Sequence, residues 1–232
     1  FDTETTGLPK RWNAPISDTD NWPRCVQIAW QLHDDSGRLL EHYDALVQPE
    51  GFNIPYDAEQ IHGISTDLAT AQGKPLKEVL EDFEAVMAKT QFVVGQNVSF
   101  DLNFMGAEFY RDSGANPLES LPVLDTCTED TAELCQLPGG RGGKFKLPTL
   151  TELHEHLFGE PFNEAHNASA DVEATSRCFL ELVRRKSFSA DILGQGPGYL
   201  QRFEQANPEI IPPFGLKHKN LKKPSEALAR KT

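Results

Sequence analysis

Strand-like and helix-like segments alternate along the first 186 residues of this chain. Residues 24–33 have the period of two that is typical of a strand, and Gly37 separates them from a second strand at 39–48, which predicts a hairpin. Residues 75–89 place apolar side chains at spacings of three and four, as in an amphipathic helix. Further strands are expected at the N-terminus, 92–95 and 121–126, and further helices at 101–111, 150–158 and 168–186. This order predicts an α/β fold in which a mixed sheet carries helices on both faces.

Acidic side chains recur at the ends of these predicted elements. Asp2 and Glu4 lie two residues apart on the first strand, so both side chains point to one face of it. Asp101 begins the helix at 101–111 on its apolar stripe, where a charge is normally paired or bound to metal. Carboxylates that converge in this way need a cation.

A third polar segment stands at the start of the last predicted helix. His166 and Asp171 are five residues apart, which on a continuous helix would separate them by about 140°. We therefore expect His166 in the preceding loop and Asp171 in the first turn, with Asn167 or Ser169 as N-cap. Each of these residues alone is usually a cap, a solvated charge or a loop hydrogen-bonding group. Their joint pattern favours a site.

Composition limits the class of protein. The chain has 232 residues, enough for one core and an appendage, and its apolar residues form no run of about 18 that could span a membrane. No secretion signal is visible. The cysteines have no C-x-x-C or zinc-ligand spacing, which favours reduced core thiols and a cytoplasmic location over a disulfide or metal set. They are Cys25, Cys127, Cys135 and Cys178.

The net charge of −13 is unusual for a chain that might bind nucleic acid. Two divalent ions in a carboxylate site would offset part of it locally. Unaided affinity for nucleic acid should nevertheless be weak. We therefore expect a partner or a tether to deliver the substrate.

The polar segments resemble the three motifs of the DEDDh, or DnaQ-like, 3′-5′ exonuclease superfamily. The motifs are Asp2-x-Glu4 in FDTETTG, Asp101 in GQNVSFD, and His166 with Asp171 in HNASAD. The resemblance covers residues 1–186. It implies a ribonuclease H-like fold, with a mixed five-stranded sheet flanked by helices.

The resemblance also implies a reaction and its residues. Two divalent ions about 4 Å apart can activate water and stabilise the leaving oxygen of a phosphodiester, and oxygen ligands suit Mg²⁺, with Mn²⁺ as a substitute. Asp2, Glu4 and Asp171 would hold the ion that activates water, while Asp2 and Asp101 would hold the second ion. His166 would be the general base. The expected product is a nucleoside 5′-monophosphate released from a 3′ end.

Substrate contacts are likewise implied by the resemblance. Glu4 and the backbone near Thr5 would meet the terminal 3′-hydroxyl. The last nucleotides would be held by Thr6, His62, Ile64, Asn97 and Phe100. Phe100 is equally compatible with a stacking platform and with a core position.

The end of the sequence has a different character. Residues 187–232 combine glycines, prolines and a basic end, and we interpret them as a C-terminal linker or tail that follows an exonuclease domain at 1–186. The glycine-rich basic segment 139–146 is either a solvent loop or a phosphate contact. A strand that places Asp2 at its functional end should not begin at Phe1, so we expect residues before it and a larger parent protein.

The whole chain resembles the exonuclease region fused ahead of the polymerase in certain bacterial DNA polymerase III α subunits, similar to the epsilon proofreading subunit. This implies proofreading of a single-stranded DNA 3′ end that the tethered polymerase passes over, with no membrane partner. Two alternatives remain, an exoribonuclease of the same superfamily and a non-catalytic polymerase adaptor. A phosphatase with an aspartyl nucleophile is disfavoured, because it would have Asp in place of Glu4.

Overall fold

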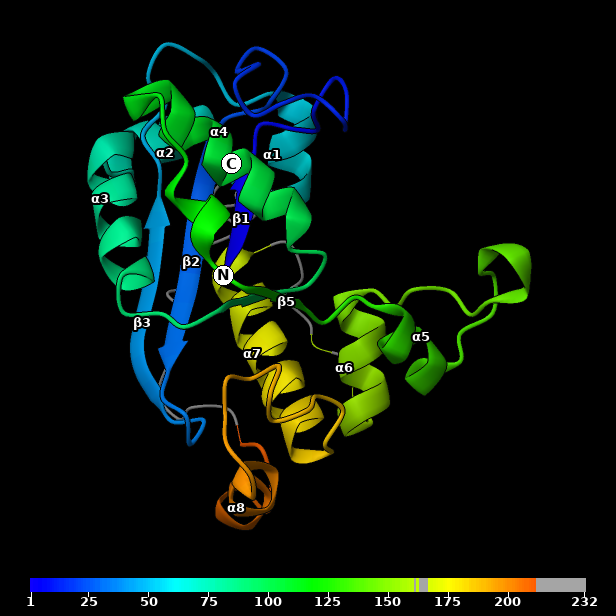
Figure 1. Ribbon diagram of the computed structural model, residues 1–232. Helices are drawn as coiled ribbons and strands as arrows, with labels where there is room; N and C mark the ends of the chain where they lie inside the picture. The colour runs from blue at the N-terminus through cyan, green and yellow to red at the C-terminus, as the bar shows by residue number, and fades with distance from the viewer. Residues whose placement is uncertain (161, 163–166, 212–232) are drawn as a thin grey trace, which may run out of the picture.

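Two small sheets form the centre of the molecule. The computed structural model describes residues 1–160, 162 and 167–211. Strands β1 (Asp2–Thr5), β2 (Cys25–His33) and β3 (Leu39–Leu46) form an antiparallel sheet in the order β1-β2-β3 (Figure 1). Strands β4 (Val93–Gly95) and β5 (Val123–Asp125) form a parallel pair. The predicted mixed α/β arrangement with five strands is confirmed.

The five strands are divided between two sheets, whereas a single five-stranded sheet was expected. The nitrogen of Phe1 donates a hydrogen bond to the carbonyl oxygen of Val94 at 3.0 Å, so β1 adjoins β4 at its first residue. Among the described residues, β1 and β4 share no further ladder pairing. The two sheets therefore meet at one point.

Helices cover both faces of the antiparallel sheet (Figure 1). On one face, Ile28 and Trp30 of β2 pack against α3 (Leu76–Met87) and α4 (Ser99–Ser113). On the other face, Ala29 packs against α7 (Ala168–Arg184). Burial of each larger apolar side chain contributes about 1.5–3 kcal/mol to this core. The alternation along β2 thus brings three helices around β1, which carries the first acidic motif.

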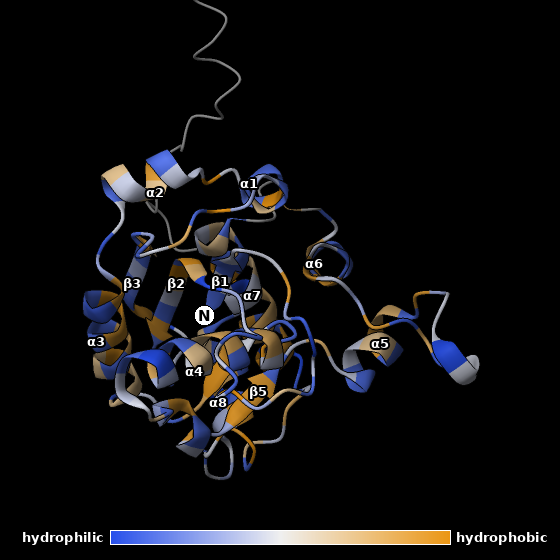
Figure 2. Ribbon diagram, turned by 90° about the horizontal axis from the view of Figure 1, so that it is seen from above, coloured by the Kyte–Doolittle hydropathy of each residue, from blue (hydrophilic) through white to orange (hydrophobic). Residues whose placement is uncertain are grey.

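Shorter helices flank this framework. The helices α1 (Tyr56–His62) and α2 (Thr66–Gln72) pack on β2 and β3 through a small apolar cluster. The helix α5 (Glu129–Cys135) and the loop after it project from the main body in both views (Figures 1 and 2). The helix α6 (Leu150–Phe158) packs on α7, and the 3-10 turns are η1 (Pro117–Ser120) and η2 (Arg141–Gly143).

The described part of the predicted tail packs onto the domain. It forms α8 (Tyr199–Ala206), and Leu193, Phe203 and Ile210 are buried against Phe179 of α7. The boundary proposed after residue 186 stays a prediction, and residues 212–232 lie outside the described part. In that part, no helix combines the length and the apolar character needed to cross a membrane.

Candidate functional site

Three carboxylates from two elements meet beside β1. One oxygen of Asp2, one of Glu4 and one of Asp171 all lie within 4.8 Å of one another. The strand register sets Asp2 opposite Ala29, and Ala29 contacts the first turns of α7. The small side chain of Ala29 lets α7 approach closely, which brings Asp171 to the two acids of β1.

A fourth carboxylate is attached to the same strand. Asp101 lies in the first turn of α4 and is 5% exposed. Its Oδ1 accepts hydrogen bonds from the backbone N–H of Thr3 at 3.0 Å and from the Thr3 hydroxyl at 2.6 Å. Thr3 stands between Asp2 and Glu4, so it links Asp101 to the three-carboxylate cluster. No role was predicted for Thr3 from the sequence, although its position between two motif acids is the signal for such a role.

Burial raises the pKa values of three of these carboxylates, and neighbouring charges add to the shift for Asp2 and Glu4. Burial, and then the neighbouring carboxylates, raise the pKa of Asp2 well above its ordinary value. Burial, followed by the charges of Asp171 and Asp101, raises the pKa of Glu4 to about 8. Burial raises the pKa of Asp101 to about 6, although the hydrogen bond from Thr3 lowers it. Bringing these groups together as anions is therefore unfavourable without a positive charge.

The donor set fits a hard divalent cation. Carboxylate oxygens are the ligands that Mg²⁺ and Mn²⁺ prefer, and the three described residues of the cluster all supply carboxylates. Within the described ranges, this is the one group of three or more histidine, cysteine or acidic side chains close enough to share an ion. The mutual repulsion of the acids is also what a bound cation would relieve.

The third motif is only partly within the described residues. His166 lies outside them, so its role as general base stays a prediction. Asn167 is the N-cap of α7, as expected, and its side chain accepts a hydrogen bond from the Ala170 N–H at 3.3 Å. This cap starts the helix so that Asp171 occupies its first turn.

Two predicted substrate residues, Thr5 and Thr6, shape the turn after β1. The Thr5 hydroxyl donates to the carbonyl of Gly7 at 2.8 Å, and the Thr6 hydroxyl accepts from the Arg24 N–H at 2.9 Å. A third, Asn97, is exposed and has a left-handed backbone with φ of 57°. Its N–H donates to Asp125 Oδ1 at 2.8 Å. Asp125 was not anticipated, and it orders the turn that precedes α4.

The predicted residues His62 and Ile64 lie at the end of α1. His62 is 9% exposed, and its Nδ1 accepts a hydrogen bond from the Ile64 N–H at 3.1 Å. Ile64 is buried with Val26 in the cluster beneath α1 and α2. Both residues therefore hold this turn in place, and their contact with a nucleotide stays a prediction.

Phe100 belongs to a row of aromatic rings next to Asp101. It is half-buried, with ring centroids 4.0 Å from Phe104 and 5.5 Å from Trp12. Trp12 is 60% exposed, and the sequence analysis gave it no role. The signal for it was a tryptophan beside Arg11 in a loop with no helical or strand period. This arrangement offers one partly exposed and one largely exposed ring, and the first of them, Phe100, immediately precedes Asp101 in the sequence.

Comparison with known proteins places this arrangement in a family. The sequence model of the exonuclease family RNase_T matches residues 1–179. The chain therefore belongs to this exonuclease family, and its predicted membership of the DnaQ-like 3′-5′ exonucleases is confirmed.

Curated relatives include DNA polymerase III of the PolC type. The protein from Streptococcus thermophilus is 27% identical over 223 residues, which are 96% of this chain and 13% of that protein. The protein from Streptococcus pneumoniae is 27% identical over 184 residues, 79% of this chain and 11% of that protein. The chain thus spans about an eighth of the length of the first of these relatives.

Solved structures share the fold. The structure of E. coli exonuclease I in complex with a dT13 oligonucleotide aligns with a TM-score of 0.60 at 20% identity, over 80% of this chain and 40% of that one. Exonuclease X in complex with 5′ overhanging duplex DNA aligns with a TM-score of 0.53 at 20% identity, over 82% of this chain and 93% of that one. The predicted ribonuclease H-like fold is confirmed.

Proposed function

We propose that this chain is a 3′-5′ exodeoxyribonuclease domain that removes nucleoside 5′-monophosphates from single-stranded DNA ends. The observation that carries the proposal is the meeting of Asp2, Glu4 and Asp171, with Asp101 fixed beside them through Thr3. An exonuclease family fold with this acidic cluster supports hydrolysis of a phosphodiester over binding alone.

The four carboxylates are the proposed ligands of two divalent cations, Mg²⁺ by preference and Mn²⁺ as a substitute. Asp2, Glu4 and Asp171 would hold one ion, and Asp2 with Asp101 the other. Bound there, the ions would supply an activated water and charge stabilisation for the leaving oxygen. His166 would accept the proton of that water, since an imidazole titrates near neutral pH.

The aromatic row is the proposed platform for unpaired bases. Phe100 offers a partly exposed ring next to Asp101, and Trp12 extends this surface outward. The Trp12 loop is held in place, because Asn21 Oδ1 accepts from the Arg11 N–H at 2.8 Å and Asn21 Nδ2 donates to the Arg11 carbonyl at 3.0 Å. Stacking on such rings tolerates any base, as an exonuclease requires.

Proofreading for a replicative polymerase is the proposed context. It rests on the PolC-type relatives, of which the chain matches about an eighth. The net charge of −13 agrees with a domain that receives its DNA from an attached polymerase and does not capture it alone. A cytoplasmic location belongs to the same proposal.

The experiment uses 5′-labelled single-stranded DNA and RNA of one sequence, with Mg²⁺, Mn²⁺ or EDTA. A metal-dependent ladder that shortens from the 3′ end of DNA, with much slower loss of RNA, supports the proposal. Faster loss of RNA would identify an exoribonuclease, and no cleavage of either would identify an adaptor. Asp2→Asn should abolish the ladder, and the exposed Asp67→Asn of α2 is the matched control.

A further inference from the structure

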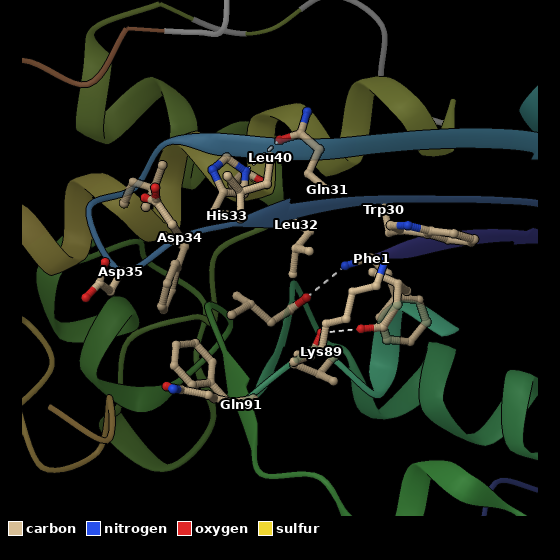
Figure 3. Close-up of a pocket in the computed structure, with 18 of the residues that line it drawn as sticks. Phe1, Trp30, Gln31, Leu32, His33, Asp34, Asp35, Leu40, Lys89 and Gln91 are labelled. Atoms are coloured by element: carbon tan, nitrogen blue, oxygen red, sulfur yellow. Dashed lines mark hydrogen bonds between the residues drawn. The ribbon is translucent and has the colours of Figure 1, made fainter. Parts of the chain in front are cut away.

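The fold around β1 is packed loosely at one end of the strand and tightly at the other. Beside Phe1 lies a cavity of about 530 Å³, which Leu32 and Gln91 also line (Figure 3). None of the residues that line this cavity belongs to the acidic cluster or to the aromatic row. After the strand, by contrast, Thr6 exchanges two hydrogen bonds with the backbone of Arg24, where a buried network of charged side chains begins. The well-ordered end of β1 is therefore the one that leads into the loop with the exposed ring.

The centre of this network is Glu108 of α4, whose side chain is fully buried. Its carboxylate accepts hydrogen bonds from the Cys25 N–H at 2.8 Å and from Arg24 Nε at 3.0 Å. On the other side, Arg111 Nη1 lies 3.0 Å from its Oε2. A buried ion pair is often no more stabilising than apolar groups of similar volume. The network is therefore explained better by the positions that it fixes than by its contribution to stability.

Arg111 connects the network to the loop before β2. Its guanidinium donates hydrogen bonds to the carbonyl of Trp22 at 2.6 Å and to the carbonyl of Thr19. The ring of Trp22 is buried and packs edge-on against Phe104 of α4, with ring centroids 5.6 Å apart. The loop at 19–23 is therefore held on α4 both by its backbone carbonyls and by one buried ring.

The part of the loop that is held on α4 in turn holds the backbone next to Trp12. Asn21 lies between the two residues whose carbonyls Arg111 binds, and its buried side chain makes two hydrogen bonds to the Arg11 backbone, at 2.8 and 3.0 Å. Phe100, the other ring of the pair, stands in the first turn of α4. One helix thus carries Phe100 at its start and, near its end, the side chains that set the position of Trp12.

We propose that Glu108 and Arg111 are positioning residues for the substrate, which hold the Trp12 ring beside Phe100 and thereby set the affinity for an unpaired DNA end. This role rests on the proposed function, because it requires that the aromatic row binds bases. Neither residue belongs to the carboxylate cluster, so the chemical step does not depend on them. Loss of their hold on the loop should therefore raise KM and leave kcat nearly constant.

Arg111→Met tests this role, because it removes the hydrogen bonds to the loop while Glu108 keeps its other arginine. The matched control is Arg184→Met on α7. Glu181 is buried as Glu108 is, lies 2.7 Å from Arg184 at the same spacing of three residues, and has a second arginine 2.6 Å away. Among the described contacts, Arg184 bonds to no backbone carbonyl. The control thus removes a similar ion pair without releasing a loop.

The measurements are KM and kcat for 5′-labelled single-stranded DNA with Mg²⁺, and amide hydrogen exchange at Lys10 and Arg11 without DNA. Arg111→Met should raise KM about tenfold, as loss of one stacking ring does, change kcat less than about twofold, and speed exchange at both amides. In Trp12→Ala, the same substitution should raise KM by less than about a further twofold. Arg111→Lys keeps the charge next to Glu108 and should give an intermediate KM. It takes the place of Arg111→Met if that chain does not fold.

An unchanged KM in Arg111→Met would overturn the inference. A full further rise in KM in the Trp12→Ala chain would overturn it as well, because Arg111 would then act by a route other than the ring. An equal rise in Arg184→Met would assign the effect to a general loss of stability. If the wild-type chain cleaves no DNA, the proposed function fails and this role fails with it. Unchanged amide exchange in a chain that does cleave DNA overturns the positioning role alone.

Discussion

At the scale of single residues, Thr3 is the least expected part of the site. Its hydroxyl and backbone N–H both donate to Asp101 Oδ1, so it sets the position of that carboxylate. Thr3→Val keeps the shape and removes the hydroxyl donor. We expect stability to fall by about 1–2 kcal/mol and turnover to fall about tenfold. Urea unfolding and single-turnover cleavage measure these effects, and Thr3→Ser should restore both. Wild-type turnover in Thr3→Val would remove Thr3 from the site.

Removal of the proposed base and of a metal ligand should have different effects. His166→Ala should leave metal affinity intact and lose most turnover, because water activation lacks its proton acceptor. Asp2→Ala should weaken both metal affinity and turnover, because Asp2 belongs to the three-carboxylate cluster. Mn²⁺ titration by calorimetry, together with cleavage rates, separates the two outcomes. Full activity in either variant would contradict the mechanism.

The raised carboxylate pKa values predict a pH dependence in the metal-free state. The pKa of Glu4 is about 8 against an ordinary 4.5, and that of Asp101 is about 6 against 3.8. At pH values between the ordinary and the raised pKa of each group, the folded chain therefore binds more protons than the unfolded chain. In EDTA, the free energy of unfolding should fall as pH rises from about 4.5 to about 8. Urea unfolding across this range measures it.

A matched substitution tests the origin of that slope. Glu4→Gln removes the carboxyl whose pKa is raised to about 8 and should flatten the decline above pH 6. Saturating Mg²⁺ should flatten it as well, because a cation favours the ionised carboxylates. If neither Glu4→Gln nor Mg²⁺ changes the slope of the free energy of unfolding against pH, titration of other groups causes that slope.

At the scale of elements, the Trp12 loop provides the clearest prediction. Trp12→Ala removes the exposed ring of the aromatic row. We expect KM for single-stranded DNA to rise about tenfold, since stacking on one ring is worth about 1–3 kcal/mol, with a smaller change in kcat. Trp12→Phe should keep most of the affinity. The exposed Leu8→Ala in the same loop is the control, and an equal KM rise there would indicate a general loop effect.

The long periodic elements followed from the sequence, and several short helices did not. The hairpin, α3 and α6 lie within a few residues of their expected bounds, because burial of one face imposes a clear period. The helices α1, α2 and α8 have only seven or eight residues, too few for a distinct period. The pairing of β4 with β5, apart from the antiparallel sheet, joins distant segments of the chain, and no local pattern encodes it.

In the candidate site, too, local features could be predicted from the sequence and long-range contacts could not. Asp2 and Glu4 could be paired from strand geometry, and the cap at Asn167 correctly placed Asp171 in a first turn. The partnership of Asp101 with Thr3 joins residues 98 positions apart, so the place of Thr3 between two acids could suggest a role but not this partner. The contact of Trp12 with Phe100 was missed, because it connects a loop to a distant helix.

At the scale of the whole molecule, charge and architecture support the same proposal. The acidic cluster lies in a chain of net charge −13, so its field repels DNA until cations are bound. Metal loading and substrate entry should then be coupled, since each reduces the repulsion that opposes the other. Repulsion of DNA by such a domain matters least when another part of the same assembly holds the DNA.

Whether the exonuclease domain ends near residue 186 can be decided from the packing of α8. Phe203 is 3% exposed and packs in one cluster with Phe179 and Val183 of α7. If this segment belongs to the domain, Phe203→Ala should lower the free energy of unfolding by about 3 kcal/mol in a single cooperative urea transition. Ile211→Ala, at a residue that is 54% exposed, should change it little. Loss of a buried ring that belongs to one cooperative unit must change the stability of that unit. An unaffected main transition in Phe203→Ala would therefore show that the core at 1–186 is independent and that the segment after it is a linker.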